Sequence, residues 1–99
     1  MIVRIVQMTF HADKTAEFES VFSSACEKIR SFPGCQHLEL WHSLNSDNVY
    51  FTYSIWENAE SLDHYRFSTL FKTTWAKTKV LFSAPPVALS LEKSWPTSS

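Results

Sequence analysis

Glycine is almost absent from this 99-residue chain, which contains only Gly34. Loops that cradle phosphate groups need several glycines, because their backbone must approach the ligand closely. The sequence therefore excludes a glycine-rich nucleotide-binding loop.

Cysteine is also scarce, and the only two are Cys26 and Cys35. Two cysteines do not make a disulfide framework, and Cys26 falls in an apolar helical pattern where a buried free thiol is the commoner case. His37 and His42 lie five residues apart on an expected strand and so point to opposite faces. Because no group of Cys, His and carboxylate residues has the spacing of metal ligands, we expect no metal site.

The chain has little net charge, −1 at neutral pH, and no long apolar run. A protein without a basic surface is a poor partner for nucleic acid or for an anionic membrane. No stretch approaches the roughly 20 apolar residues that a membrane span requires. The opening residues also lack the basic and apolar segments of a secretion signal, so we expect a cytoplasmic protein.

Apolar and aromatic residues are abundant, at 44% and 15% of the chain. This composition is typical of a globular domain, which we place at residues 1–93, followed by a polar tail at 94–99. Two β-α-β units are predicted from the hydrophobic periodicity. The expected strands are residues 2–10, 36–42, 48–56 and 87–93, and the expected helical regions are 13–31 and 59–81.

Local signals define the ends of the expected helices. Asp13 is a candidate N-cap for the first helix, and Pro33-Gly34 ends it. Asn58 is a candidate N-cap for the second helical region, in which we expect a break near Ser68-Thr69. The order β-α-β-β-α-β predicts an α+β, ferredoxin-like domain with a four-stranded antiparallel sheet.

The first strand is apolar on both of its faces. One set of alternating residues begins with Ile2 and includes Arg4; the other begins with Val3 and includes Gln7. Two helices cover only one side of such a sheet, so the other side would expose an apolar patch that marks an interface. We therefore expect a homodimer that packs sheet face against sheet face.

Tryptophans lie near the ends of the expected strands. We expect Trp41 and Trp56 to pack at the rim of the domain. Trp95 follows the last strand, and we expect it to dock on the partner subunit.

Several segments together resemble a known family. They are the opening MIVRIVQMTF, Pro33-Gly34-Cys35, the strand end Ile55-Trp56-Glu57-Asn58, and the following Glu60-Ser61-Leu62 and Ser68-x-x-Phe71. Over residues 1–93 the chain resembles the antibiotic biosynthesis monooxygenases, which are dimeric α+β barrels. The family includes cofactor-free oxygenases that act on polycyclic phenols and quinols, haem-degrading enzymes and small-molecule isomerases. The fold alone does not choose among these activities.

The resemblance implies a pocket between the sheet and the second helical region. The working residues of the haem-degrading members fall on Gln7, Tyr65 and Trp75. Trp75 cannot ligate iron, because its indole nitrogen only donates hydrogen bonds, and haem binding is therefore disfavoured. Many quinol-type members carry two histidines where this chain has Tyr65 and Leu70. His64 lies about 100° around the helix from Tyr65 and is not a simple substitute.

We take Gln7, Tyr65 and Trp75 as candidate catalytic residues because each carries a polar group that can face a cavity. The candidate substrate-binding residues are Leu62, Leu70 and Phe71. The alternative for the helix residues is packing alone, since their spacing is typical of one buried helix face. His64 and Arg66 lie on other faces of that helix, where we expect them to be solvated.

Two functions remain open at this stage. The first is a monooxygenase without cofactor or metal, acting on a small aromatic molecule of the phenol or quinol type. The second is a non-catalytic dimer that binds a small molecule on the same scaffold. Loss of both family histidines favours the second function, because no general base occupies the obvious positions.

Overall fold

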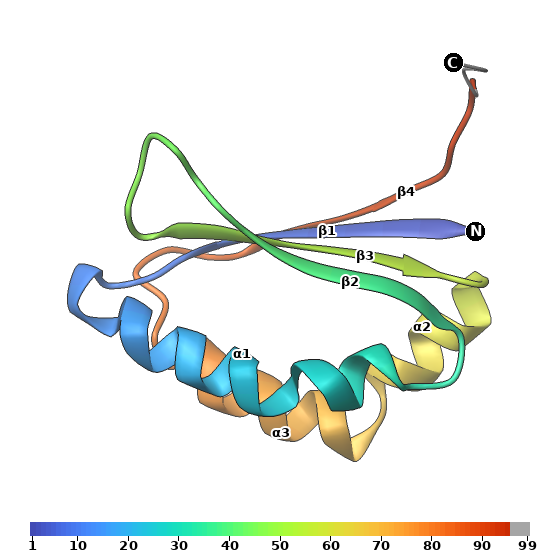
Figure 1. The fold of residues 1–99 in the computed structure, drawn as a ribbon, viewed down its shortest axis with the longest axis horizontal. Helices are drawn as coiled ribbons and strands as arrows, with labels where there is room; N and C mark the ends of the chain where they lie inside the picture. The colour runs from blue at the N-terminus through green and yellow to red at the C-terminus, as the bar shows by residue number, and fades with distance from the viewer. Residues whose placement is uncertain (96–99) are drawn as a thin grey trace.

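Four antiparallel strands form one sheet in the order β2-β3-β1-β4, and three helices lie against it (Figure 1). The computed structural model describes residues 1–95, so the expected tail at 94–99 falls partly outside the described residues. The strands are β1 (Ile2–Thr9), β2 (Cys35–His42), β3 (Val49–Trp56) and β4 (Val87–Leu91). The helices are α1 (Thr15–Arg30), α2 (Ala59–Arg66) and α3 (Thr69–Lys79), and a short 3-10 turn, η1 (Ala12–Lys14), precedes α1.

Capping side chains divide the second helical region as predicted. The Asn58 side chain accepts a hydrogen bond from the Ser61 backbone N–H at 2.8 Å and so begins α2. The Ser68 hydroxyl accepts a hydrogen bond from the Phe71 backbone N–H at 3.1 Å and so begins α3. The predicted N-cap at Asn58 and the predicted break are therefore confirmed.

The start of the first helix differs from the prediction. Asp13 lies inside η1, and α1 begins only at Thr15, after Lys14. Neither helical element begins with a side-chain capping bond. Asp13 is therefore not the N-cap, because the chain first makes a 3-10 turn in which the Lys14 N–H bonds to the His11 carbonyl.

All three helices cover the same side of the sheet, and the core lies between them and the sheet (Figure 1). At one end of this layer, Phe10 stacks on Phe18 at 4.2 Å between ring centroids and is fully buried. At the other end, Trp56 packs with Cys35 and Leu62 and is 1% exposed. The expectation that Trp56 lies at the rim is wrong: the last residue of β3 points toward the helices, not toward solvent. Trp41 is partly exposed on the other side.

The opposite side of the sheet carries no helix among the described residues, and it is largely apolar, with His37 and Glu39 of β2 also on it. Val87, Leu89 and Leu91 of β4 are each about half exposed. The Trp41 and Tyr53 rings stack at 4.8 Å on the neighbouring strands. We call this side the open face. It is defined by the β1 residues Val3, Ile5, Gln7 and Thr9 together with their partners across the sheet.

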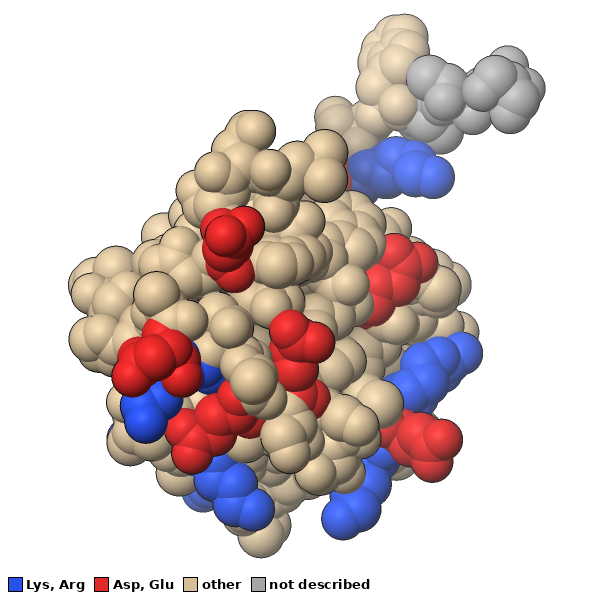
Figure 2. All heavy atoms as spheres, turned by 60° about the vertical axis from the view of Figure 1, so that its left-hand side comes forward, with Lys and Arg blue, Asp and Glu red and all other residues tan. Residues whose placement is uncertain are grey.

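Charged side chains gather away from the sheet. In Figure 2, acidic and basic side chains are interspersed over the lower, helical part of the visible side, with no continuous basic area there. The part of this view above the helices is mostly uncharged. Within residues 1–95, no helix has both the length and the apolar character needed to cross a membrane.

Gly34 connects α1 to β2 in a conformation that other residues adopt at a cost, with φ of 90°. Its carbonyl accepts a hydrogen bond from the Glu57 N–H at 2.8 Å, which ties the turn to the end of β3. A β-carbon at this position would overlap Cβ and Oγ of Ser61 on α2. The single glycine thus lets the α1–β2 turn approach α2 closely.

We predict that Gly34→Ala lowers the free energy of unfolding by about 1–3 kcal/mol, measured by urea denaturation. Backbone strain and the overlap with Ser61 both contribute to the loss. The double variant Gly34→Ala with Ser61→Gly should recover the part that comes from the overlap. Ser61→Gly and Ser61→Ala alone serve as controls for the helix. Unchanged stability in Gly34→Ala would contradict this account of the turn.

Candidate functional site

A cavity of about 380 Å³ lies between the helix-covered side of the sheet and the three helices. Its size falls within the range of small-molecule sites, roughly 300–1,000 Å³. The sheet contributes side chains from all four strands. The lining residues are Arg4, Val6, Met8, Phe18, Phe22, Ile29, Leu38, Thr52, Ser54, Trp56, Leu62, Tyr65, Arg66, Phe71, Thr74, Trp75, Thr78, Pro86 and Ala88.

The floor of the cavity has small polar side chains in its centre. Thr52 and Ser54 alternate along β3 and face the helices. The Ser54 hydroxyl accepts a hydrogen bond from the Trp56 indole N–H at 3.0 Å, which fixes the indole at the cavity's edge. Because threonine and serine are short, they leave space between the sheet and the helices that larger side chains would fill.

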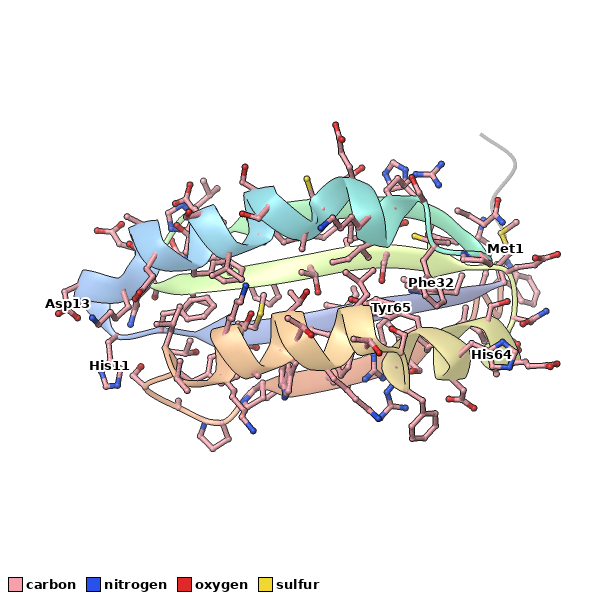
Figure 3. The ribbon with its side chains drawn as sticks, turned by 90° about the horizontal axis from the view of Figure 1, so that it is seen from below. Met1, His11, Asp13, Phe32, His64 and Tyr65 are labelled. Atoms are coloured by element: carbon pink, nitrogen blue, oxygen red, sulfur yellow. The ribbon has the colours of Figure 1, made fainter. Side chains whose placement is uncertain are left out.

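A chain of aromatic rings forms the wall on the side of α2 and α3. Tyr65 stacks on Trp56 at 4.8 Å and meets Phe71 edge to face at 5.2 Å. Phe71 in turn stacks on Trp75 at 5.7 Å. Across the layer, Tyr65 also contacts Phe32, and Figure 3 shows these two rings side by side. The wall is therefore a continuous, mutually supported set of flat apolar surfaces.

The Tyr65 phenol stays protonated well above neutral pH. Burial raises its pKa above the ordinary value, and the neighbouring Cys35 adds to the increase. No hydrogen-bond partner for its hydroxyl lies among the described residues, and no buried side-chain oxygen or nitrogen there lacks a partner. The hydroxyl is therefore accessible, and because it stays protonated it can donate a hydrogen bond but cannot serve as a base.

The structure places four of the sequence-predicted residues in the cavity wall. These are Leu62 and Tyr65 on α2, and Phe71 and Trp75 on α3. Tyr65 and Trp75 both line the cavity, and each carries a hydrogen-bond donor, a phenol O–H and an indole N–H respectively. Both are also part of the packed aromatic wall, so packing and binding are not alternatives for these side chains.

The other two candidates lie elsewhere. Gln7 is on the open face, where its neighbours across the sheet are Phe51 and Val87. The expectation that it lies beside the pocket is wrong, because alternation along β1 sends Arg4, Val6 and Met8 to the cavity and Gln7 to the other side. Leu70 does not line the cavity either. It borders a shallower groove between α1 and α3.

Sequence reasoning missed the two cations of the cavity. Arg4 lies in the middle of β1 and Arg66 at the end of α2, and both line the cavity. Arg66 is partly exposed, as expected, but it also borders the site. One signal pointed to Arg4: it is the only charge in its strand and shares the alternating set of Met8 and Phe10. His64 is 70% exposed and outside the lining.

The described residues offer no ready metal centre. Within residues 1–95, no three His, Cys, Asp or Glu side chains come together in a group that could hold a metal ion. The cavity itself has no histidine or carboxylate in its lining. What the arrangement can do chemically is enclose a flat apolar molecule and present hydrogen-bond donors and positive charge to it.

Comparison with known proteins agrees with this geometry. A family model described as antibiotic biosynthesis monooxygenase matches residues 1–77. No curated protein sequence matches the chain at a significant level. Among solved structures, a Caulobacter crescentus protein assigned to the antibiotic biosynthesis monooxygenases is similar, with a TM-score of 0.88 and 25% identity. The match covers 95% of this chain and 90% of that one.

Two further solved structures share the fold at lower identity. Rv0793 from Mycobacterium tuberculosis has a TM-score of 0.88 and 16% identity, with 98% of each chain covered. A conserved protein from Methanosarcina mazei has a TM-score of 0.89 and 19% identity, covering 95% of this chain and 94% of that one. The predicted α+β, ferredoxin-like fold with one four-stranded antiparallel sheet, as in the dimeric α+β barrels, is confirmed.

We predict that Tyr65 ionises only above the ordinary tyrosine pKa of about 10. Because the folded protein holds this proton more tightly than the unfolded chain, its stabilising effect is complete below that pH. The effect is lost as the pH rises through the folded-state pKa. Tyrosinate absorbance, followed against pH, should lose part of its high-pH amplitude in Tyr65→Phe, and the rest belongs to Tyr50.

Circular dichroism at each pH checks that the protein remains folded. Burial and the hydrogen bond to Glu19 raise the pKa of Tyr50 to about 12, so Tyr50→Phe is the matched comparison. Loss of absorbance below about pH 10 in Tyr65→Phe would contradict the assignment.

Proposed function

Because this chain belongs to the antibiotic biosynthesis monooxygenase family, we propose that it is a cofactor-independent monooxygenase that oxidises a small aromatic phenol or quinol. The observation that carries the proposal is the cavity between sheet and helices, with its flat aromatic wall and its two accessible donors. A planar ring fits between such rings, and an oxygen on that ring finds the Tyr65 hydroxyl or the Trp75 indole N–H.

The reaction needs only the substrate and molecular oxygen. The phenol O–H loses its proton to water, and the resulting phenolate, which carries part of its charge on the neighbouring ring carbon, gives one electron to O₂. The substrate radical and superoxide then form a C–O bond, and the peroxide takes up a proton. Loss of one water molecule from this hydroperoxide leaves a carbonyl. The phenol O–H, the neighbouring ring C–H and O₂ thus become two C=O groups and one H₂O.

The protein's contribution is orientation and charge stabilisation. The phenolate carries much of its charge on the oxygen, and a hydrogen bond to that oxygen stabilises the anion more than the neutral substrate. Tyr65 suits this role because it stays protonated in the pH range where the substrate ionises. The apolar lining keeps water from the peroxide before it breaks down.

A second function, binding without catalysis, is favoured by one specific observation. The lining of the cavity contains no histidine or carboxylate that could take the substrate's proton. A general base contributes about 10²–10⁴-fold to such reactions. A cavity without a general base is suited to a protein that binds aromatic molecules and leaves them unchanged.

We predict oxygen uptake by the purified protein, without added metal or flavin, on at least one member of a panel of anthrones, naphthols and hydroquinones. Tyr65→Phe should lower the rate by about 10- to 100-fold, because it removes one donor to the developing anion. Lys72→Gln, on an exposed part of α3 outside the lining, should leave the rate unchanged.

Absence of uptake with every compound, together with thermal stabilisation by some of them, would replace the oxygenase with the binding function. Equal rates in Tyr65→Phe and Lys72→Gln would remove Tyr65 from the mechanism.

We also propose that the open face pairs with the same face of a second chain. Its apolar side chains cross all four strands, and a patch of this kind is uncommon on a monomer. Trp95 follows β4 and is 86% exposed, and we expect it to contact the partner. A two-fold axis through this face would leave the cavity of each subunit on the outside of the pair.

We predict a mass of twice the 11.5 kDa subunit by light scattering after gel filtration. Leu89→Arg should shift the protein to the monomer, because it places a charge in the middle of the open face. Val80→Arg is the matched control: Val80 is 70% exposed at the end of α3, on the helix side. A dimer that persists in Leu89→Arg would show that another surface joins the subunits.

A further inference from the structure

Arg4 is a charged residue placed where the sheet faces the core. It stands in β1 between Val3 and Ile5, and alternation turns it toward the helices with Val6 and Met8. Its guanidinium donates a hydrogen bond to the Ser90 hydroxyl of β4 at 2.8 Å. Within residues 1–95 it makes no ion pair with a carboxylate at 4 Å or less. A partly buried cation thus has only a neutral partner.

Arg66 brings a second positive charge to the same cavity. It is the last residue of α2, and its side chain is 47% exposed, so it connects the cavity with solvent. Its nearest carboxylate is Asp63, one helical turn earlier and 3.9 Å away, on an exposed side chain that does not line the cavity. An exposed pair at that distance contributes little, and Arg66 remains available to a ligand.

The two guanidinium groups are close enough to affect one another. Burial lowers the pKa of Arg4, and the like charge of Arg66 lowers it further. Arginine nevertheless stays charged at any pH at which the protein is folded. Arg4 is partly stripped of water by burial and also faces the like charge of Arg66, and both effects are unfavourable unless an anion joins the two groups.

A bound anion would reverse this cost. The planar fork of a guanidinium matches the two oxygens of a carboxylate, and it makes shorter, stronger hydrogen bonds with an ionised partner than with a neutral one. The Ser90 hydroxyl accepts a hydrogen bond from only one nitrogen of Arg4. The other N–H groups of Arg4 are left for the ligand. The apolar remainder of the cavity favours a small anion on a large flat ring.

We propose that Arg4 and Arg66 form an anion subsite that binds the carboxylate of an aromatic acid, while its ring lies against Tyr65, Phe71 and Trp75. The inference names the substrate class of the proposed oxygenase, an aromatic hydroxy acid, and in that respect rests on the proposed function. A phosphate ester is the less suitable ligand, because its second charge and tightly held water would enter a largely apolar space.

The test compares two ligands that differ only in charge. 2-Naphthoate and its neutral amide, 2-naphthamide, have the same ring and nearly the same shape. Isothermal titration at neutral pH should give at least about tenfold tighter binding of the naphthoate, the usual effect of a hydrogen bond to a charged group. Arg66→Gln should remove most of this preference and leave the affinity for naphthamide within about twofold.

Arg4→Gln should have the same effect, and Arg4→Lys, which keeps the charge but not the fork, should lose part of the preference. Lys72→Gln removes a positive charge from α3 outside the cavity and should change neither affinity. If Arg4→Gln does not fold, as judged by circular dichroism, the exposed Arg66→Gln variant alone decides the outcome.

Equal binding of naphthoate and naphthamide would overturn the subsite, as would an Arg66→Gln variant that keeps the full preference. Tighter binding of 2-naphthyl phosphate than of naphthoate would overturn its assignment to carboxylates. Because neither naphthoate nor naphthamide needs to be oxidised, the result is separate from oxygen uptake. Naphthoate selectivity without uptake on any phenol removes the oxygenase and keeps the subsite. Uptake on phenols, together with equal binding of naphthoate and naphthamide, removes the subsite and keeps the oxygenase.

Discussion

The alternation of side chains along β1 is the constraint on which the rest of this structure depends. β1 lies inside the sheet, between β3 and β4. Its side chains therefore alternate between the helix-covered side of the sheet and the open face. The helices cover the set that contains Met8 and Phe10, which makes that side the core and the other side the open face. The same choice assigns Arg4 to the cavity and Gln7 to the exterior. A one-residue shift in register would exchange all of these roles.

The cavity exists because large and small side chains are distributed unequally in the layer between sheet and helices. Aromatic rings fill both ends, with Phe10 and Phe18 at one and Trp56 and Tyr65 at the other. Between them, the short side chains of Thr52 and Ser54 do not reach the helices. The rings support each other by stacking and edge contacts. The break at Ser68 contributes as well, since it lets α2 and α3 follow the sheet separately.

Local chemistry explains how much of this could be predicted from the sequence. Asn58, Ser68 and Gly34 act on the backbone of residues close to them in the sequence. The helix ends that they define could therefore be predicted from a few residues. The helix residues of the cavity wall could be predicted too, because their spacing defines one face.

Arg4 and Gln7 could not be predicted in the same way. Both interrupt a strand that is apolar on both sides, and only tertiary packing decides which one faces the helices. Resemblance to the haem-degrading members favoured Gln7 as the pocket residue of this strand. The alternation of side chains along β1 instead puts Gln7 on the open face. Trp56 likewise ends its strand, a position that is a rim in many sheets and is core here because α2 packs over it.

The distribution of charge in the cavity bears on the absence of a base. A general base accelerates proton loss by accepting the proton, but a positive field promotes the same step by stabilising the anion that remains. In the proposed reaction, Arg4 and Arg66 would supply such a field from the cavity lining, and Tyr65, whose pKa is raised by burial, would supply a neutral donor. A substrate whose phenol or enol already ionises readily would then need only water as the proton acceptor. This arrangement suits acidic, electron-rich aromatic molecules and disfavours simple phenols, whose protons are held more tightly. The chemistry open to this cavity is thus set by the acidity of the ligand rather than by a catalytic base of the protein.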